Sequence, residues 1–232
     1  MKNFNFAFYY ISIYVILFIL GEKMLSLPVL KKLTKEIYKL FKEENTGHDF
    51  SHLKRVMQNA IYIQKREGGD LYIIAISALV HDIHRLVSNQ KGYFVRAEDC
   101  LDVVEKILKD CGIEKEKIKE ILYIVENHER KREKIFNLET YIVQDADILD
   151  ALGKIGLKRC LKYCKTHKIP VSNTKYPLNS PEYIPDINPI SPCHYIYNTI
   201  IPNADFLYTE TAKKMAKGKV KMLENFVKHN YK

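Results

Sequence analysis

Apolar residues recur along most of this chain at the spacing of one face of an α-helix. Between Pro28 and Glu44 they stand at positions 30, 33, 37, 40 and 41, and the proline falls in the first helical turn. Asp49 is placed as the N-cap of a second helix, which ends at the paired glycines 68 and 69. Asp70 then precedes the strongly apolar sequence LYIIAISALV, and we expect this segment to be a buried helix.

The second half of the chain continues in the same way after a connector of about ten residues. Helices are expected at residues 96–110, 114–128, 138–152, 154–166, 194–200 and 204–229. The proline-rich segment from Ile169 to Pro192 is irregular, which in a compact domain indicates a lid or a binding loop more than a linker. We see no internal repeat and no convincing set of strands. The pattern predicts an all-α protein built as one helical bundle.

A hydrophobic segment precedes this domain. The apolar run from Phe4 to Leu20 is 17 residues long, at the lower limit for a membrane-spanning helix. No small-residue cleavage site follows it, and the lysines after it would keep the rest of the chain in the cytoplasm. Alternatively, translation starts at Met24. Residues 1–23 are therefore either a membrane anchor or a mis-assigned start, and residues 24–232 form the working domain.

Composition narrows the class of protein. The 232 residues can bury one good core, and 47% hydrophobic with 28% charged residues exclude wholesale disorder. The net charge of +9 could attract polyanions, but the lysines are scattered along exposed helical positions. We interpret this charge as solvated surface and expect no specific nucleic-acid partner. The five cysteines form no Cys-x-x-Cys pair, which argues against a zinc knuckle or a disulfide framework and favours a reducing cytosol.

Metal-competent side chains stand on otherwise apolar helices in three segments. These are GHDFSHLKRV with His48 and His52, ALVHDI with His81 and Asp82, and YIVQDADILDALG with Asp145, Asp147 and Asp150. An unpaired carboxylate in such a setting would be costly, whereas a shared divalent cation would satisfy all three segments. A mixed nitrogen and oxygen site suits Mn, Fe, Co or Mg, and its open positions would bind phosphate and water. Taken singly, a buried histidine is more often a satisfied core residue.

The chain order His, His-Asp, Asp resembles the HD-domain superfamily of metal-dependent phosphohydrolases. The sequences GHDFSHLKRVMQNA, SALVHDI and VQDADILDALG are similar to a bacterial subgroup that includes nucleoside-triphosphate pyrophosphohydrolases. The resemblance covers roughly residues 30–226. It implies an HD-type helical bundle in which His52, His81, Asp82 and Asp147 hold a divalent metal, with Mn favoured over Mg, Fe, Co and Ni. Asp82 would also orient the attacking water.

The resemblance also implies roles around the metal. His128 would lie beside the metal or the substrate phosphate as a catalytic residue, although a histidine at a helix C-terminus also interacts with the helix dipole. Substrate-binding or supporting roles fall to His48, Arg55, His84, Arg85, Asp150 and His194. His84 and Arg85 depart from the common HDIG form. Asn198 and Thr199 replace an acidic-basic pair after His194, which weakens the role assigned to that histidine.

The implied activity is hydrolysis of a small phosphorylated substrate, with a nucleotide as the first choice. Conversion of a (deoxy)nucleoside triphosphate to the monophosphate and pyrophosphate follows from the subgroup resemblance. Two other functions stay open: a 5′-nucleotidase-like phosphomonoesterase, and a non-catalytic metal-binding sensor or interaction module. We expect a cytoplasmic domain, with a membrane tether through residues 4–20 if that segment belongs to the protein. The sequence does not indicate an oligomeric state.

Overall fold

The structure is a computed structural model that describes residues 27–231, apart from residues 45, 46, 132 and 186. The predicted hydrophobic segment at residues 4–20 and the alternative start at Met24 lie outside the described residues. Within the described part the regular structure is helical, and the only β pairing is an isolated bridge between Ile184 and Asn188. The prediction of an all-α fold is confirmed.

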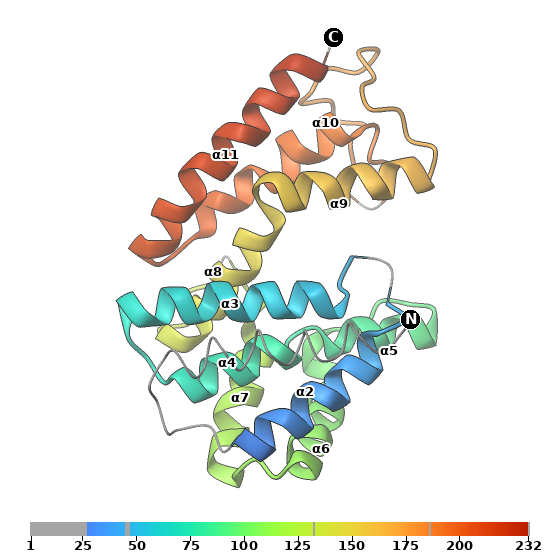
Figure 1. Ribbon diagram of the computed structural model, residues 1–232. Coiled ribbons are helices and arrows are strands. Elements are labelled where there is room, and N and C mark those ends of the chain that lie inside the picture. Colours follow the sequence, from blue (N-terminus) through green and yellow to red (C-terminus); the bar gives the residue numbers. More distant parts are fainter. Residues whose placement is uncertain (1–26, 45–46, 132, 186, 232) are drawn as a thin grey trace, which may run out of the picture.

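Two groups of helices make up the described chain (Figure 1). The N-terminal bundle contains α2 (Leu27–Phe41), α3 (Phe50–Glu67), α4 (Leu71–Val80), α5 (Ile83–Lys91), the 3₁₀ turn η1 (Ala97–Cys100), α6 (Leu101–Cys111), α7 (Lys115–Asn127) and α8 (Leu138–Ala151). The C-terminal lobe contains α9 (Gly153–Thr166), α10 (Pro192–Tyr195), the π turn η2 (Ile196–Ile200), the 3₁₀ turn η3 (Pro202–Phe206) and α11 (Glu210–Asn230). α8 leads from the bundle into the lobe, where α9 packs along α11.

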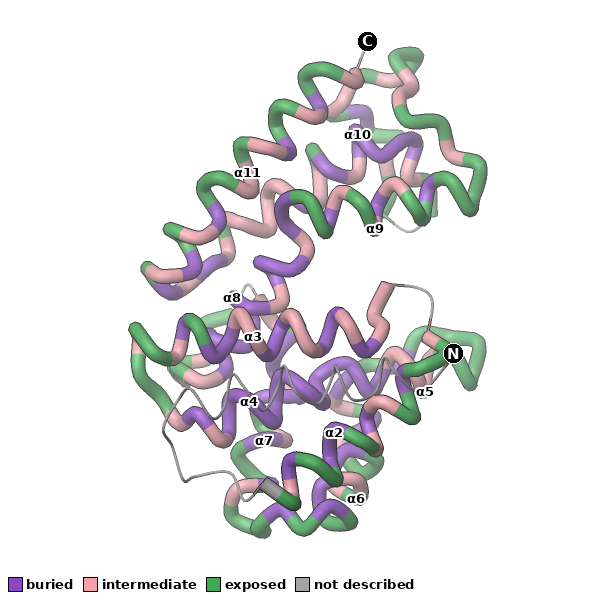
Figure 2. Tube along the Cα trace, viewed as in Figure 1, coloured by how far each residue is buried: buried purple, intermediate pink, exposed green. Residues whose placement is uncertain are grey.

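The core of the bundle forms around α4. This helix is apolar on all sides, so burial on every face is its stable arrangement. α3, α7 and α8 pack against it, and Figure 2 shows it as an almost continuously buried segment. Its N-terminus is capped by Asp70, whose Oδ1 accepts hydrogen bonds from the backbone N–H groups of Tyr72 and Ile73. Asp49 caps α3 in the same way through the N–H of His52, which confirms the predicted N-cap.

The segment Leu71–Lys91 has the length and apolarity of a membrane span. It consists of α4 and α5, which are separated at His81 and Asp82, and 72% of its most apolar window is buried inside the protein. The apolar character of this segment is therefore used in the core of the bundle. All five cysteines are also buried, with free thiols, as expected for a chain without a disulfide framework.

Two predicted boundaries are wrong. The connector expected before residue 96 contains α5, a short polar helix that ends at Gly92 with a left-handed φ of 73°. The last helix begins at Glu210 rather than at residue 204, because residues 202–206 form a 3₁₀ turn and Thr209 is the N-cap. The buried carboxylate of Asp145 fixes this start, since it accepts hydrogen bonds from the backbone N–H groups of Tyr208 and Thr209.

Gly153 makes the turn between α8 and α9. Its φ of +75° lies in the left-handed region, and a Cβ there would stand 3.0 Å from Cγ of Lys219. This turn redirects the chain from the bundle into the lobe, so that α9 passes beside the end of α8 that carries Asp147 and Asp150.

Candidate metal centre

Four side chains that are distant in the sequence meet inside the bundle. His52 comes from α3, His81 and Asp82 from the junction between α4 and α5, and Asp147 from α8. Nε2 of His52 lies 3.2 Å from Oδ2 of Asp82 and 3.5 Å from Oδ1 of Asp147, and Nε2 of His81 lies 3.4 Å from Oδ2 of Asp82. The structure therefore brings together the four residues that the sequence proposed as metal ligands.

Hydrogen bonds orient both imidazoles toward the centre of this group. Nδ1 of His52 lies 2.8 Å from Oδ2 of Asp150, and Nδ1 of His81 lies 2.9 Å from the carbonyl oxygen of Ala78. A carbonyl or carboxylate oxygen can only accept, so each Nδ1 carries a proton, and each Nε2 is the nitrogen that could bind a cation once it is deprotonated. Both Nε2 atoms are buried and have no hydrogen-bond partner. A divalent cation would satisfy them, and a second ring nitrogen held by carboxylate or carbonyl is the usual support for a metal-binding histidine.

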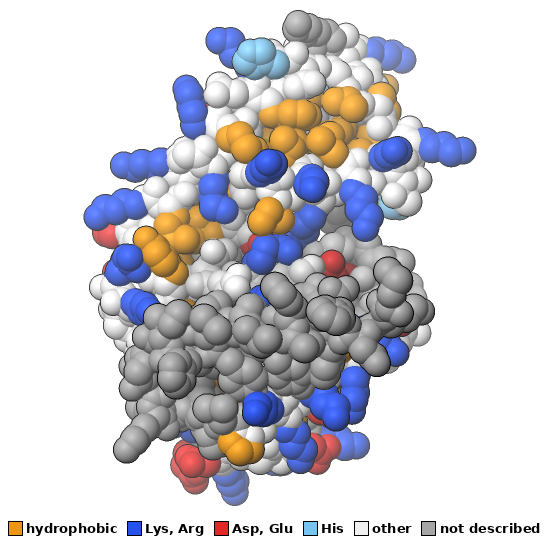
Figure 3. Space-filling model, in the orientation of Figure 1, with side chains coloured by type: hydrophobic (Ala, Val, Ile, Leu, Met, Phe, Trp, Pro, Cys, Tyr) orange, Lys and Arg blue, Asp and Glu red, His pale blue; other side chains and the backbone are white. Residues whose placement is uncertain are grey.

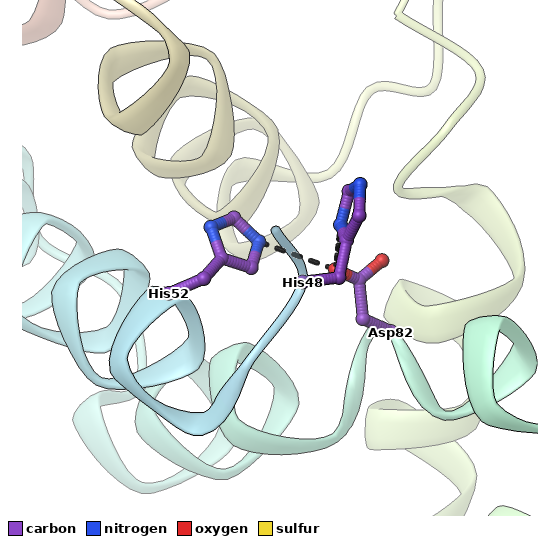
Figure 4. A group of neighbouring side chains, drawn as sticks. All are labelled: His48, His52 and Asp82. Carbon is purple, nitrogen blue, oxygen red and sulfur yellow. Dashed lines mark hydrogen bonds and ion pairs between the residues drawn. The ribbon is translucent and has the colours of Figure 1, made fainter. Parts of the chain in front are cut away.

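His48 and His128 border the group on different sides. Nδ1 of His48 lies 2.7 Å from Oδ2 of Asp82, and Figure 4 shows this histidine and His52 directed at the same carboxylate. Nε2 of His128 lies 4.0 Å from Oδ1 of Asp82, while its Nδ1 donates to the carbonyl of Val125 at 2.6 Å. Asp82, His84 and His128 form a further group whose ligand atoms lie within 4.8 Å of one another. Asp82 is thus shared between two clusters of imidazoles.

The charges of the centre compensate one another. Burial alone would raise the pKa of Asp82, but the charges of His81 and His48 hold it well below its usual value. Burial would likewise raise the pKa of Asp147, but the charges of Lys131, His81 and His52 lower it. For His52 burial lowers the pKa, but the hydrogen bond to Asp150 and the nearby carboxylate of Asp82 outweigh this and raise it to about 9. The carboxylates are therefore ionised and ready to bind a cation.

His128 differs from His52 in that its pKa is lowered rather than raised. Burial, followed by the charge of His81, lowers its pKa to about 4. At neutral pH its ring is uncharged, and because Nδ1 donates to a carbonyl, Nε2 is a proton acceptor. His128 can therefore accept a proton from a water or substrate group but cannot donate one.

Asp150 supports the centre by holding the ring of His52. Its carboxylate accepts hydrogen bonds from Arg55 at 2.6 and 3.0 Å and from Nη1 of Arg159 at 2.9 Å, in addition to the one from His52. The side chain of Asp150 is 1% exposed, so this carboxylate is buried beside the proposed ligands. Arg55 bonds to Asp150, which in turn holds the ring of the proposed ligand His52.

Three charged residues at the centre were not proposed from the sequence. Nζ of Lys131 lies 2.7 Å from Oδ2 of Asp147, Arg159 bonds to Asp150, and Glu129 pairs with Arg85 at 2.6 Å and with His84 at 3.5 Å. Lys131 and Glu129 stand in the charged loop after α7, and Arg159 stands on the Lys-rich α9. No local pattern separates them from their solvated neighbours, so only the spatial contacts reveal them.

His194 lies apart from the other candidates. Nδ1 bonds to Oγ of Ser191 at 2.8 Å, and Nε2 lies 3.2 Å from the carbonyl oxygens of Tyr176 and Pro177. The ring is fully buried and edge-on to Tyr231. It ties the irregular segment 169–192 to α10 and α11, and it belongs to none of the metal-competent groups of the described residues. Its contacts are those of an anchor for the loop.

A pocket of about 390 Å³ opens beside Asp147, between the bundle and the C-terminal lobe. Its polar wall contains His48, Arg85, Lys131, Asp147 and Arg159, and its apolar wall comes from the lobe through Cys160, Tyr163, Tyr195 and Ile200. Pro189, from the segment predicted to be a lid or binding loop, lines the same pocket. A ligand with several negative charges and an apolar portion fits this division.

Known proteins resemble the chain over most of its length. The family model described as "HD domain" matches residues 49–152. The uncharacterized protein YpgQ of Bacillus subtilis is 27% identical over 199 residues, which are 83% of this chain and 87% of that protein.

Solved structures agree with this match. The Lin1889 protein of Listeria innocua is 30% identical with a TM-score of 0.64, covering 87% of this chain and 92% of that one. An HD-superfamily hydrolase of Bacillus thuringiensis is 28% identical with a TM-score of 0.64, covering 86% and 93%. Bacillus subtilis YpgQ in complex with ADP is 23% identical with a TM-score of 0.68, covering 88% and 95%, a likeness of fold.

Proposed function

Because this chain belongs to the HD superfamily of metal-dependent phosphohydrolases, we propose that it hydrolyses nucleotides, releasing pyrophosphate from a (deoxy)nucleoside triphosphate. The observation that carries the proposal is the pair of buried Nε2 atoms of His52 and His81. Both lack a hydrogen-bond partner and lie 3.2–3.5 Å from carboxylate oxygens of Asp82 and Asp147.

These four residues would hold the metal. Two imidazole nitrogens and two carboxylate oxygens suit Mn, Fe, Co, Ni or Mg, and we favour Mn. When bound, the cation would supply Lewis acidity, which polarises a phosphoryl oxygen and lowers the pKa of a water. The protein supplies the rest of the chemistry through the groups around the ion.

Asp82 and His128 would orient the attacking water and accept its proton. Oδ2 of Asp82 accepts from His48, and Oδ1 faces His128 Nε2 at 4.0 Å. A water between Asp82 Oδ1 and the neutral His128 would be oriented by both acceptors, and either could take its proton as it attacks phosphorus in line. The low pKa of His128 keeps Nε2 available for this role at neutral pH.

The basic side chains of the pocket would bind the phosphates. His48, Arg85, Lys131 and Arg159 surround the opening beside Asp147, where charge develops on the nonbridging oxygens. Tyr163 and Tyr195 line the part of the pocket that belongs to the lobe, and an aromatic wall suits a nucleoside. The complex of YpgQ with ADP adds weight to a nucleotide as the ligand. We place this activity in the cytoplasm.

The test is a release assay on purified protein. Nucleoside tri-, di- and monophosphates are incubated with Mn, Mg, Co or Ni, and pyrophosphate and orthophosphate are measured separately. We expect pyrophosphate from triphosphates, and a loss of at least about a hundredfold in Asp82→Ala and Asp147→Ala.

Other outcomes identify other functions. Orthophosphate from monophosphates would replace the proposal with a 5′-nucleotidase-like phosphomonoesterase. Tight metal binding without turnover of any nucleotide would identify a sensor or interaction module. Equal activity in the wild type and both variants would show that the activity comes from a contaminant.

A further inference from the structure

The net positive charge of the protein comes from one part of the chain. Residues 1–152 carry 23 Lys and Arg against 23 Asp and Glu, whereas residues 153–232 carry 14 Lys and Arg against 5 Asp and Glu. The whole formal excess of +9 therefore belongs to the C-terminal lobe. A general bias toward lysine would load both parts alike, so it does not explain this asymmetry.

The two parts also differ in how their basic side chains are neutralised. Among the described residues of the N-terminal bundle, three exposed lysines pair with a glutamate: Lys39 with Glu36 and Lys109 with Glu105, both at 2.8 Å, and Lys42 with Glu43 at 3.8 Å. In the described part of the lobe, the one ion pair of an exposed lysine joins Lys213 to Glu210 at 2.9 Å. The exposed lysines of the lobe are Lys154, Lys158, Lys162, Lys165, Lys168, Lys175, Lys213, Lys214, Lys217, Lys221 and Lys228.

Most of these lysines lie on two helices that pack side by side. Lys154, Lys158 and Lys162 recur at four-residue spacing along α9, and Lys214, Lys217 and Lys221 follow one another along α11. Figure 3 shows blue side chains spread over this face of the lobe with little red among them. The exposed lysines of α11 run from Lys213 to Lys228, so the basic face is about 23 Å long.

We propose that the face formed by α9 and α11 binds the phosphate backbone of nucleic acid without sequence preference. A row of unneutralised cations of this length can contact several successive phosphates and release their counterions. Among the described residues α11 exposes no large hydrophobic side chain and α9 exposes two, Ile155 and Tyr163, so lysines outnumber apolar groups on this face and favour phosphates over a lipid interior. Contacts to phosphates fix position without reading sequence.

Binding is tested with a labelled DNA duplex by fluorescence anisotropy. If four phosphates are neutralised, raising the salt from about 50 to about 200 mM weakens binding by roughly a hundredfold, independently of sequence. The test variant replaces six lysines of the basic face by glutamine: Lys158, Lys162, Lys165, Lys214, Lys217 and Lys221. We expect it to lose at least about tenfold in affinity at low salt and most of the salt dependence.

The matched control removes the same number of charges from the N-terminal bundle. It replaces the exposed Lys39, Lys42, Lys106, Lys109, Lys115 and Lys119 by glutamine, and should bind the duplex within about twofold of wild type. Circular dichroism and metal titration show whether both variants stay folded. Equal losses in the two variants would overturn the proposal, because net charge would then suffice. So would absence of duplex binding at low salt, or binding only to vesicles of phosphatidylcholine with about one third phosphatidylserine.

Discussion

At the scale of single residues, Asp150 decides which nitrogen of His52 faces the centre. The carboxylate accepts a hydrogen bond from Nδ1 of His52 at 2.8 Å and is itself bonded by Arg55 and Arg159. Asp150→Asn removes the charge that makes His52 a good ligand and leaves two arginines without a counter-charge. We expect the affinity for Mn to fall about 10- to 100-fold, as measured by calorimetric titration.

Asp145 provides a matched control on the same helix. It is buried as well, but its partners are Tyr208 and Thr209, away from the metal ligands. Asp145→Asn should lower the free energy of unfolding by about 1–3 kcal/mol and leave the Mn affinity of the folded protein unchanged. Similar losses of Mn affinity in both variants would show that Asp150 acts only through the stability of α8.

The raised pKa of His52 predicts a pH dependence of metal binding. With a pKa of about 9 in the metal-free protein, His52 is protonated at neutral pH, whereas a metal ligand must be deprotonated. Protons compete less as the pH rises, so the Mn affinity should increase about tenfold per pH unit between about pH 6 and about pH 8. Calorimetry in buffers of different ionisation enthalpy should detect close to one proton released. A flat profile would mean that His52 does not bind the ion.

At the scale of elements, Thr209 joins the start of α11 to α8. Its Oγ1 donates to Oδ2 of Asp145 at 2.6 Å and accepts from the N–H of Ala212 at 3.2 Å. Thr209→Ala loses both bonds and should lower the free energy of unfolding by about 1–2 kcal/mol in denaturant titration. Thr209→Ser keeps the hydroxyl and should restore most of it. If the two variants were equally stable, the hydroxyl would not be what fixes this helix start.

The elements that the sequence predicted well are those with local signals. α3 is predicted by its N-cap Asp49 and its apolar positions, and α4 by the long apolar run after Asp70. α5 was missed because it is short and polar, and its start is set by the break at His81 and Asp82. The start of α11 was missed because it depends on the distant carboxylate of Asp145.

The same distinction applies to the candidate centre. His52, His81, Asp82 and Asp147 stood out as polar groups on apolar helices, and the structure brings them together. Lys131 and Arg159 carry no such signal, since each is one cation among many in its own segment. His194 was proposed because its segment resembled one of the family, and the structure shows its ring engaged with Ser191 and the loop carbonyls.

At the scale of the whole molecule, the proposed ligands come from α3, the α4–α5 junction and α8. An ion bound there would join three elements that separate on unfolding, so it would bind only the folded state. At about a hundredfold excess over its dissociation constant, Mn should add about 2.7 kcal/mol to the free energy of unfolding. Thermal unfolding should show a higher Tm with Mn in the wild type and no shift in Asp147→Ala. A shift of equal size in that variant would place the stabilising ion elsewhere.

The central position of α4 has a consequence for hydrogen–deuterium exchange. Segments buried on all sides open only when the whole domain unfolds, so their amides exchange last. His81 and Asp82 directly follow this segment. We therefore expect deuterium to enter the backbone of residues 74–80 more slowly than that of α9 or α11, when exchange is followed by mass spectrometry. His81 and Asp82 would then keep their positions through every partial opening of the lobe, and inactivation by heat would follow global melting.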